Sequence, residues 1–212
     1  MKKIVVIDYG IGNVKSMVNA LENLGVEAVL TGDEQEIMAA DAVILPGVGA
    51  FKHGMDNLIE RNLVPVIHNY VATGKPFLGV CLGMQMLMEE SEEFGRSKGL
   101  GLIEGSVKII PLLSDTTEKL PHVSWNELIE PTKGRWNDTI LSTTKDGTDM
   151  YFVHSFAAIP NHQTDVLASC NYGNLNFCAA VHKKNIYGTQ FHPEKSGIFG
   201  LRILEEFIKL IN

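Results

Sequence analysis

One cysteine stands in a setting that suits a nucleophile. Cys81 lies within Gly79-Val80-Cys81-Leu82-Gly83, after the apolar run Phe77–Val80 and before an amphipathic stretch. A glycine on each side lets the chain turn sharply, so that the central side chain stands exposed between strand and helix. The N-terminus of that helix favours a thiolate over a thiol. Cysteines are more commonly buried structural residues, but the two glycines and the strand-to-helix context favour a nucleophile.

A histidine and a carboxylate late in the chain could activate this thiol. His192 and Glu194 lie in the segment Gln190-Phe-His-Pro-Glu194, at the end of a predicted strand. Side chains two residues apart in an extended chain point the same way, so the carboxylate can accept from one ring nitrogen while the other faces the thiol. By itself this segment would be a solvated turn. Together with the cysteine turn it predicts a catalytic triad of Cys81, His192 and Glu194.

A glycine-rich turn could supply part of an oxyanion hole. The segment Pro46-Gly-Val-Gly49 follows a predicted strand, so its N–H groups can face an active site at the strand end. Acyl transfer to a thiol passes through an oxyanion, which about two preorganised donors stabilise. The N–H of Leu82 is one candidate and that of Val48 or Gly49 is the other. Without the cysteine, this segment would indicate only a turn.

Neither of two further glycine patterns indicates a nucleotide site. Gly10-Ile11-Gly12 follows a strand, but Lys15 occupies the place of the third glycine of a dinucleotide fingerprint. The segment Gly49–Gly54 lacks the Lys-Ser/Thr ending of a phosphate loop. We therefore expect no bound cofactor.

The first 90 residues alternate between short apolar runs and helical periodicity. We predict strands at 3–7, 26–30, 42–45 and 76–80, and helices at 14–24 and 63–73, each helix being followed by a glycine. Alternating strands and helices predict a mostly parallel central sheet with helices on both faces. Active sites of such folds lie at the carboxyl ends of the strands.

The chain changes character from about residue 106. Strand-like pieces at 150–154, 166–169, 177–182 and 186–191 are closely spaced, which predicts antiparallel additions at one side of the sheet. A last amphipathic helix at 198–211, with Ser196-Gly197 as its cap, should close the fold. No repeat or linker interrupts the sequence. We expect one α/β domain over residues 1–212.

Composition limits the partners and the compartment. The chain has 45% hydrophobic residues and 20 glycines, as a globular core requires, and its net charge of −7 makes nucleic acid and anionic membrane poor partners. The apolar run that begins the chain ends at Asp8, and no run reaches the roughly 18 residues of a membrane-spanning helix. The three cysteines, Cys81, Cys170 and Cys178, have no CxxC or zinc-like spacing. They predict free thiols, no metal and a cytoplasmic protein.

In this order, the P-G-V-G turn, the cysteine turn and the late H-P-E resemble the triad-type class I glutamine amidotransferases, which have a flavodoxin-like α/β fold. More narrowly, the chain is similar to the glutaminase subunits of imidazole glycerol phosphate synthases. The similarity runs through Ile7–Asn13, Pro121–Asn126, Tyr151–Phe156 and Gln190–Ser196. It covers nearly the whole chain.

The resemblance implies a reaction and a partner. Cys81 would attack glutamine and form a glutamyl thioester, His192 would protonate the departing ammonia and then activate water, and Glu194 would orient His192. Ammonia would pass to a barrel-shaped cyclase subunit of a heterodimer, which makes imidazole glycerol phosphate and AICAR in histidine biosynthesis. The turn Pro46–Gly49 would reorient when that partner is occupied.

The resemblance also implies roles for residues outside the triad. Gln85 and the backbone around Ser155 and Phe156 would hold glutamine, whereas the residues toward the partner would be Asn13, Trp125, Asn126 and Lys195. Trp125 could instead be ordinary core, and Lys195 a solvated charge. Ser124 departs from the family, which usually has glycine at this place.

Because of Ser124, a second kind of partner is an alternative: a synthase that amidates sugars in surface-glycan pathways. Two further alternatives involve no transfer of ammonia to a synthase. A stand-alone γ-glutamyl cysteine hydrolase would release its products without a partner, and a catalytically silent subunit would only regulate a synthase. The presence of all three triad residues argues against silence.

Overall fold

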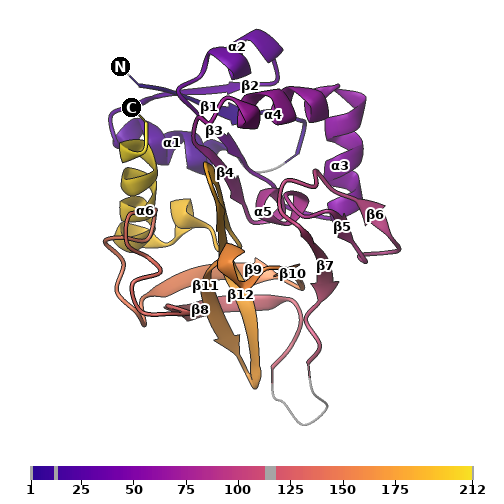
Figure 1. Ribbon diagram of the computed structural model, residues 1–212, viewed down its shortest axis with the longest axis vertical. Coiled ribbons are helices and arrows are strands. Elements are labelled where there is room, and N and C mark those ends of the chain that lie inside the picture. The colour runs from indigo at the N-terminus through magenta and orange to yellow at the C-terminus, as the bar shows by residue number, and fades with distance from the viewer. Residues whose placement is uncertain (1, 12–13, 113–117, 212) are drawn as a thin grey trace.

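A mixed sheet runs across the molecule (Figure 1). The computed structural model describes residues 2–11, 14–112 and 118–211. Within these residues nine strands form the sheet, in the order β2-β1-β3-β4-β13-β12-β11-β8-β9. Their bounds are β1 Lys3–Ile7, β2 Glu27–Thr31, β3 Ala42–Leu45, β4 Phe77–Val80, β8 His122–Ile129, β9 Asp149–His154, β11 Val166–Tyr172, β12 Leu175–Lys183 and β13 Ile186–Thr189.

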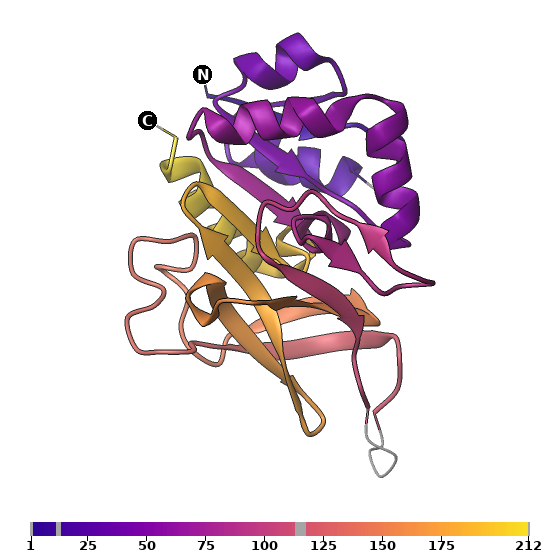
Figure 2. The same ribbon diagram turned by 45° about the vertical axis from the view of Figure 1, so that its right-hand side comes forward.

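The half of the sheet from β2 to β13 is parallel and is covered on both faces (Figure 2). Strands β3 and β4 are buried at every residue, which explains why they are short apolar runs without alternation. Apolar residues of α1 (Lys15–Asn23) and α6 (Gly197–Lys209) pack in one core. Those of α2 (Glu34–Ala39), α3 (Phe51–Glu60), α4 (Leu63–Ala72) and α5 (Leu82–Met86) pack in the other. The predicted parallel sheet with helices on both faces is confirmed.

One strand departs from the prediction. Strands β9, β11 and β12 are antiparallel as expected, and β8, which was not predicted, pairs with β9 and β11 in the same way. Strand β13, however, pairs with β4 in parallel as well as with β12 in antiparallel fashion. The short turn between β12 and β13 indicates a hairpin, whereas the pairing with β4 joins segments far apart in sequence. This pairing places Thr189 opposite Val80, so both strands end beside the same point of the sheet.

A second, four-stranded sheet was not predicted. It has the order β10-β7-β5-β6 among the described residues and comprises β5 Glu90–Ser91, β6 Ser97–Lys98, β7 Gly105–Ile109 and β10 Phe156–Pro160. Two helices were also missed, α2 and α3. The first is preceded by its N-cap residue Asp33, whose side chain accepts from the N–H of Glu36, a capping signal that is present in the sequence. No helix of the described ranges is long and apolar enough to cross a membrane.

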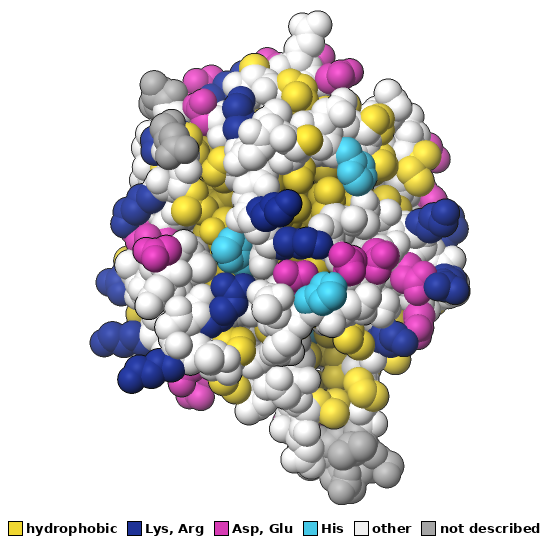
Figure 3. Space-filling view, viewed as in Figure 1, with side chains coloured by type: hydrophobic (Ala, Val, Ile, Leu, Met, Phe, Trp, Pro, Cys, Tyr) yellow, Lys and Arg dark blue, Asp and Glu magenta, His cyan; other side chains and the backbone are white. Residues whose placement is uncertain are grey.

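The surface carries charges of both signs. On the face shown in Figure 3, Lys and Arg side chains lie among Asp and Glu side chains rather than forming one basic patch. Several basic side chains of the protein pair with acidic ones, as Lys108 does with Glu92 at 2.8 Å and Lys183 with Glu104 at 3.6 Å. The described residues of this face therefore form no basic stripe of the kind that tracks a nucleic-acid backbone.

Candidate active site

Cys81 lies in the connection between β4 and α5, and its backbone is unusual. Its φ is 55° and its ψ is −109°, a region that residues other than glycine rarely occupy. Its N–H donates to the carbonyl of Thr189 at 2.7 Å, which ties this connection to the end of β13. Such a conformation costs on the order of 1–3 kcal/mol and persists only where the surroundings enforce it. It presents the thiol at the carboxyl end of β4.

The two glycines beside Cys81 serve close packing rather than the turn itself. A Cβ on Gly83 would lie 1.8 Å from the carbonyl oxygen of Leu45, and one on Gly79 would lie 2.7 Å from that of Gly83. Neither glycine has a positive φ. We expected these glycines to provide the sharp turn. This is wrong, because Cys81 itself has the positive φ at the turn. The glycines let α5 sit directly on the sheet.

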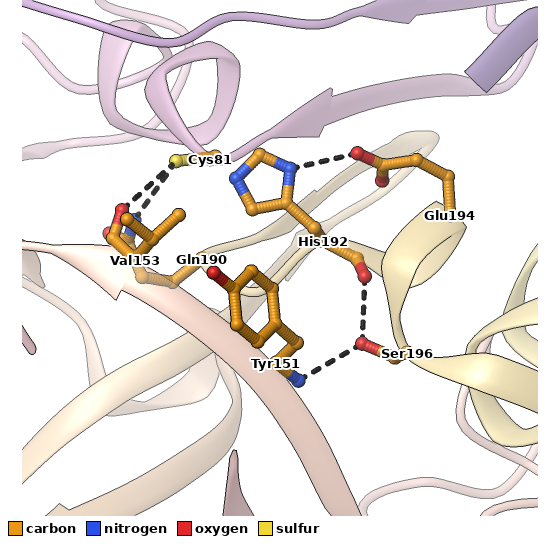
Figure 4. A network of polar contacts seen from close by, with 7 residues as sticks. All are labelled: Cys81, Tyr151, Val153, Gln190, His192, Glu194 and Ser196. Carbon is orange, nitrogen blue, oxygen red and sulfur yellow. Dashed lines mark hydrogen bonds and ion pairs between the residues drawn. The ribbon is translucent and has the colours of Figure 1, made fainter. Parts of the chain in front are cut away.

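His192 and Glu194 lie together beside the thiol (Figure 4). The Nδ1 atom of His192 is 2.9 Å from Oε1 of Glu194, and the two side chains are only 4% and 5% exposed. The other ring nitrogen, Nε2, faces Cys81 and is buried with no other hydrogen-bond partner among the described residues. The structure thus brings the three predicted triad residues together, with Nε2 available for a proton.

The surroundings of His192 favour its charged form. Burial alone would lower the pKa of its imidazole, but hydrogen bonds and charge interactions with Cys81 and Glu194 outweigh burial and raise that pKa to about 9. A histidine with this pKa is protonated at neutral pH. It can stabilise a thiolate and then give a proton to a leaving group.

Ser196 holds His192 rather than capping α6. Its hydroxyl donates to the carbonyl of His192 at 2.7 Å and accepts from the N–H of Tyr151 at 3.0 Å (Figure 4). The N–H of His192 donates to the carbonyl of Tyr151 at 3.1 Å. The side chain of Ser196 makes no cap hydrogen bond to α6, contrary to the prediction. These bonds fasten the short helix Pro193–Lys195, which carries Glu194, to β9.

The predicted oxyanion donors are not all free in this conformation. The N–H of Leu82 donates to the carbonyl of Gly47 at 3.3 Å. The turn is anchored on both sides, since the hydroxyl of Tyr9 donates to the carbonyl of Pro46 at 2.7 Å and the carboxylate of Glu93 accepts from the N–H of Phe51 at 2.7 Å. Between these anchors lie Val48 and Gly49 at the turn's exposed tip.

A cavity of about 340 Å³ opens beside the thiol. Its walls include the predicted oxyanion and substrate residues Val48, Gly49, Leu82, Gln85, Ser155 and Phe156 together with Cys81. A cavity of this size accommodates a molecule such as an amino acid. The structure therefore places all six of these residues around one pocket with the candidate nucleophile.

The comparison with protein families decides the class of this site. The sequence model of the family "Glutamine amidotransferase class-I" matches residues 5–210. The chain belongs to this family. Subunits of imidazole glycerol phosphate synthase named HisH are similar over almost their full length. The Legionella pneumophila (strain Lens) HisH 1 is 42% identical over 99% of this chain and 100% of its own, and the Aquifex aeolicus HisH is 44% identical over 96% and 94%.

Solved structures agree with the fold of a class-I amidotransferase. PurLQS from Thermotoga maritima superposes with a TM-score of 0.75 at 18% identity, covering 100% of this chain and 99% of that one. The crystal structure of a glutamine amidotransferase gives a TM-score of 0.73 at 19% identity, covering 98% of both chains. At such identities the likeness concerns the fold alone.

In this amidotransferase, the side-chain amide of Gln85 is already engaged. Its Nε2 donates to the carbonyl of Phe156 at 2.9 Å and to Oε1 of Gln190 at 3.0 Å. Both N–H groups are therefore used, so Gln85 has only its oxygen left for a substrate. The carbonyl of Ser155 likewise accepts from the N–H of Ile110 at 3.0 Å.

Three residues of the site were missed by sequence reasoning. Glu93 and His154 line the cavity, and Gln190 is fully buried with its Nε2 3.8 Å from Sγ of Cys81. Gln190 had a signal, because it lies two residues before His192 in a predicted strand, where side chains share a face. Glu93 had none, since its loop reaches the pocket only through the second sheet.

The predicted partner residues do not share one face. Trp125 is 52% exposed on β8 with its ring 5.8 Å from that of Tyr151, whereas Asn126 points to the opposite face and donates to the carbonyl of Asn171. Lys195 is exposed beside Glu194. Asn13 lies outside the described residues. Over the described ranges, no three His, Cys, Asp or Glu side chains are grouped to hold a metal ion.

Proposed function

We propose that the protein is the glutaminase subunit of an imidazole glycerol phosphate synthase, which hydrolyses glutamine at Cys81 and passes ammonia to a cyclase subunit for histidine biosynthesis. The observation that carries the glutaminase part is the triad itself: His192 is paired with Glu194 and faces Cys81, and Cys81 lies at the wall of a cavity of about 340 Å³. The similarity to HisH subunits over nearly full length supports the partner. We further propose that it acts in the cytoplasm as one domain.

The geometry gives each triad residue a step in this reaction. Sγ of Cys81 attacks the carboxamide carbon of glutamine, and the protonated Nε2 of His192 gives its proton to the leaving nitrogen, which departs as ammonia. His192, now neutral, takes a proton from water as that water attacks the thioester. Glutamate leaves and the thiolate–imidazolium pair returns. Glu194 accepts from Nδ1 at 2.9 Å and keeps the ring in this orientation.

The cavity offers groups that suit glutamine. Glu93 is only 9% exposed and lines the cavity wall, where its carboxylate suits the substrate's α-ammonium group. Gln85 can accept a hydrogen bond through its free oxygen but cannot donate one, because Phe156 and Gln190 use both of its N–H groups. We assign both residues to substrate binding, with Ser155 and Phe156 forming the facing wall.

The occupied N–H of Leu82 indicates a gate. While Leu82 donates to the carbonyl of Gly47, it cannot stabilise an oxyanion. Rotation of the turn about Val48 and Gly49 would release this donor and direct a second N–H toward the pocket. We propose that the cyclase subunit, docking near the exposed Trp125 and Lys195, favours the rotated turn and thereby couples hydrolysis to ammonia use.

The proposal is tested first at the nucleophile. Cys81→Ala should abolish glutamate release in the presence of the cyclase partner, while glutamine still binds in calorimetry. Cys178→Ala, at a buried thiol in the core, serves as the matched control and should retain turnover. Normal turnover by folded Cys81→Ala would overturn the assignment of the nucleophile.

A further inference from the structure

A buried chain of hydrogen bonds ends at the sulfur of Cys81. The carbonyl of Phe156 accepts from Nε2 of Gln85 at 2.9 Å and lies 2.8 Å from Nδ1 of His154. Gln85 continues to Oε1 of Gln190 at 3.0 Å, and Nε2 of Gln190 lies 3.8 Å from Sγ of Cys81. Gln190 is 0% exposed, so water cannot replace these partners. The proposed mechanism leaves this residue without a role.

The direction of every bond in this chain follows from one carbonyl. Because the oxygen of Phe156 can only accept, the atom of Gln85 that faces it must be the amide nitrogen. That same nitrogen faces Gln190, so the facing atom of Gln190 must be its oxygen. The nitrogen of Gln190 is then the atom turned toward Cys81. The orientation of this buried amide is therefore set by its partners and needs no separate assumption.

A second hydrogen bond to the carbonyl of Phe156, from His154, agrees with these donor and acceptor assignments. Burial lowers the pKa of His154 to about 3, so the ring is neutral and carries one proton. Its Nδ1 must hold this proton because Nδ1 faces the carbonyl of Phe156. Nε2 of His154 then accepts from Nδ1 of His122, 3.0 Å away. Phe156 thus has two donors, and its carbonyl cannot turn away without breaking both bonds.

The sulfur of Cys81 needs a donor on this side. The carbonyl oxygen of Val153 lies 4.0 Å from Sγ (Figure 4). It can accept from a thiol, but it repels a thiolate. The amide N–H of Gln190 approaches the same sulfur and offsets that repulsion, since hydrogen bonds to charged groups favour the charged form.

We propose that Gln190 is a positioning residue for the nucleophile: its side-chain amide, oriented through Gln85 by the carbonyl of Phe156, donates to Sγ of Cys81 and favours the reactive thiolate in its attacking orientation. The inference rests on the proposed role of Cys81. It assigns to Gln190 a function that needs its N–H group and not only its volume.

Alkylation of Cys81 by iodoacetamide measures thiolate reactivity without glutamine or a partner. Gln190→Met keeps the length of the side chain and removes the donor. We expect alkylation of Cys81 at neutral pH to slow about tenfold. The rise of the alkylation rate with pH should also move to higher pH. Gln163→Met makes the same change at an exposed glutamine and should leave the profile unchanged. Burial raises the pKa of Cys170 and Cys178 to about 12, so peptide mass spectrometry will find the label at Cys81.

A profile of wild-type shape in folded Gln190→Met would overturn the inference. If that variant does not fold, NMR of the wild type decides: the side-chain amide resonances of Gln190 should shift with pH, and this shift should vanish in Cys81→Ala. Resonances that ignore pH would also overturn it. The wild type could release no glutamate with any partner while alkylation of Cys81 still depends on Gln190. That result would contradict the proposed function but support this inference.

Discussion

At the scale of single residues, the site is set by a few atoms with unusual surroundings. Cys81 occupies a backbone conformation that glycine would tolerate better, and this strain directs its thiol toward His192. His192 is buried, yet Cys81 and Glu194 raise its pKa to about 9. The consequence is an imidazolium that stands beside the thiol before glutamine arrives.

Removing the charge of Glu194 tests this imidazolium. Glu194→Gln leaves a group of the same shape beside Nδ1 of His192, but it no longer stabilises the imidazolium. We expect kcat for glutamine hydrolysis to fall by about 10²- to 10⁴-fold, as when the orienting carboxylate of a triad is replaced by an amide. Glu205→Gln, at an exposed glutamate of α6, is the control and should keep the wild-type rate.

The same variant should change the pH profile in a defined direction. Protonated His192 is the proposed acid, so wild-type activity should fall as pH rises through about 9. Without the Glu194 carboxylate the pKa of His192 drops, and this alkaline limb should move to lower pH. An unmoved limb together with an unchanged kcat would contradict the role of Glu194.

At the scale of elements, the site depends on how α5 sits on β3 and β4. The helix follows Cys81 at once, and Gly83 brings its backbone against the carbonyl of Leu45. The parallel pairing of β13 with β4 then delivers His192 from the other end of the chain. The nucleophile and its acid are thus set by two strand ends that share one edge.

Gly83→Ala should distort this packing. Its Cβ would lie 1.8 Å from the oxygen of Leu45, so we expect a loss of about 4 kcal/mol or more in the free energy of unfolding. Gly25→Ala is the comparison, because Gly25 has a φ of 77° and open space around it, where alanine costs only about 1–2 kcal/mol. Urea unfolding measures both. Equal losses would show that close packing at Gly83 is not the constraint.

The sequence predicted the elements whose signals are local. Strands β1 and β3 begin and end where their apolar runs do, and Gly25 and Gly74 mark helix ends. Strands β5 and β6 are two residues long, too short for any periodicity. The pairing of β13 with β4 depends on contacts between distant segments, which spacing does not encode.

The residues of the site also divide into those with local sequence signals and those that depend on the fold. The triad could be predicted because nucleophile, base and carboxylate stand in short motifs whose chemistry limits the alternatives. Glu93 reaches the site through the second sheet, so only the assembled fold reveals it. The spacing of Gln190 from His192 indicated a shared face, but its hydrogen bond to Gln85 depends on the assembled fold. The resemblance to the family implied that Trp125 and Asn126 both face the partner. Neighbouring side chains of a strand such as β8 point to opposite faces of the sheet, so the two residues are separated.

At the scale of the whole molecule, the interior holds histidines that must stay neutral. Burial lowers the pKa of His154 to about 3 and also lowers that of His122. These two rings connect β8 and β9 beside the active site, with Nδ1 of His122 3.0 Å from Nε2 of His154. The stability of the antiparallel half is thereby linked to pH.

Acid should destabilise the fold through these rings. The unfolded chain binds a proton at His154 below its ordinary pKa of 6.5, but the folded protein does so only near 3. The contribution of His154 to the free energy of unfolding is therefore fully present above pH 6.5. It falls toward pH 3, by up to about 1.4 kcal/mol per pH unit. His154→Gln should flatten urea-unfolding stability between pH 6.5 and 4.5, whereas His68→Gln, at an exposed histidine, should not. A wild-type slope in His154→Gln would contradict this account.

The measurement that tests the central claim most directly is glutamate release from glutamine by the wild-type protein, alone and with the cyclase subunit of imidazole glycerol phosphate synthase carrying its nucleotide substrate. A closed oxyanion site, with Leu82 bonded to Gly47, predicts slow release alone and strong stimulation by the loaded cyclase. Fast release without the partner would contradict the gate and point to a free hydrolase. The absence of stimulation, with Cys81 reactive, would contradict the histidine-pathway partner and point to a sugar-amidating synthase.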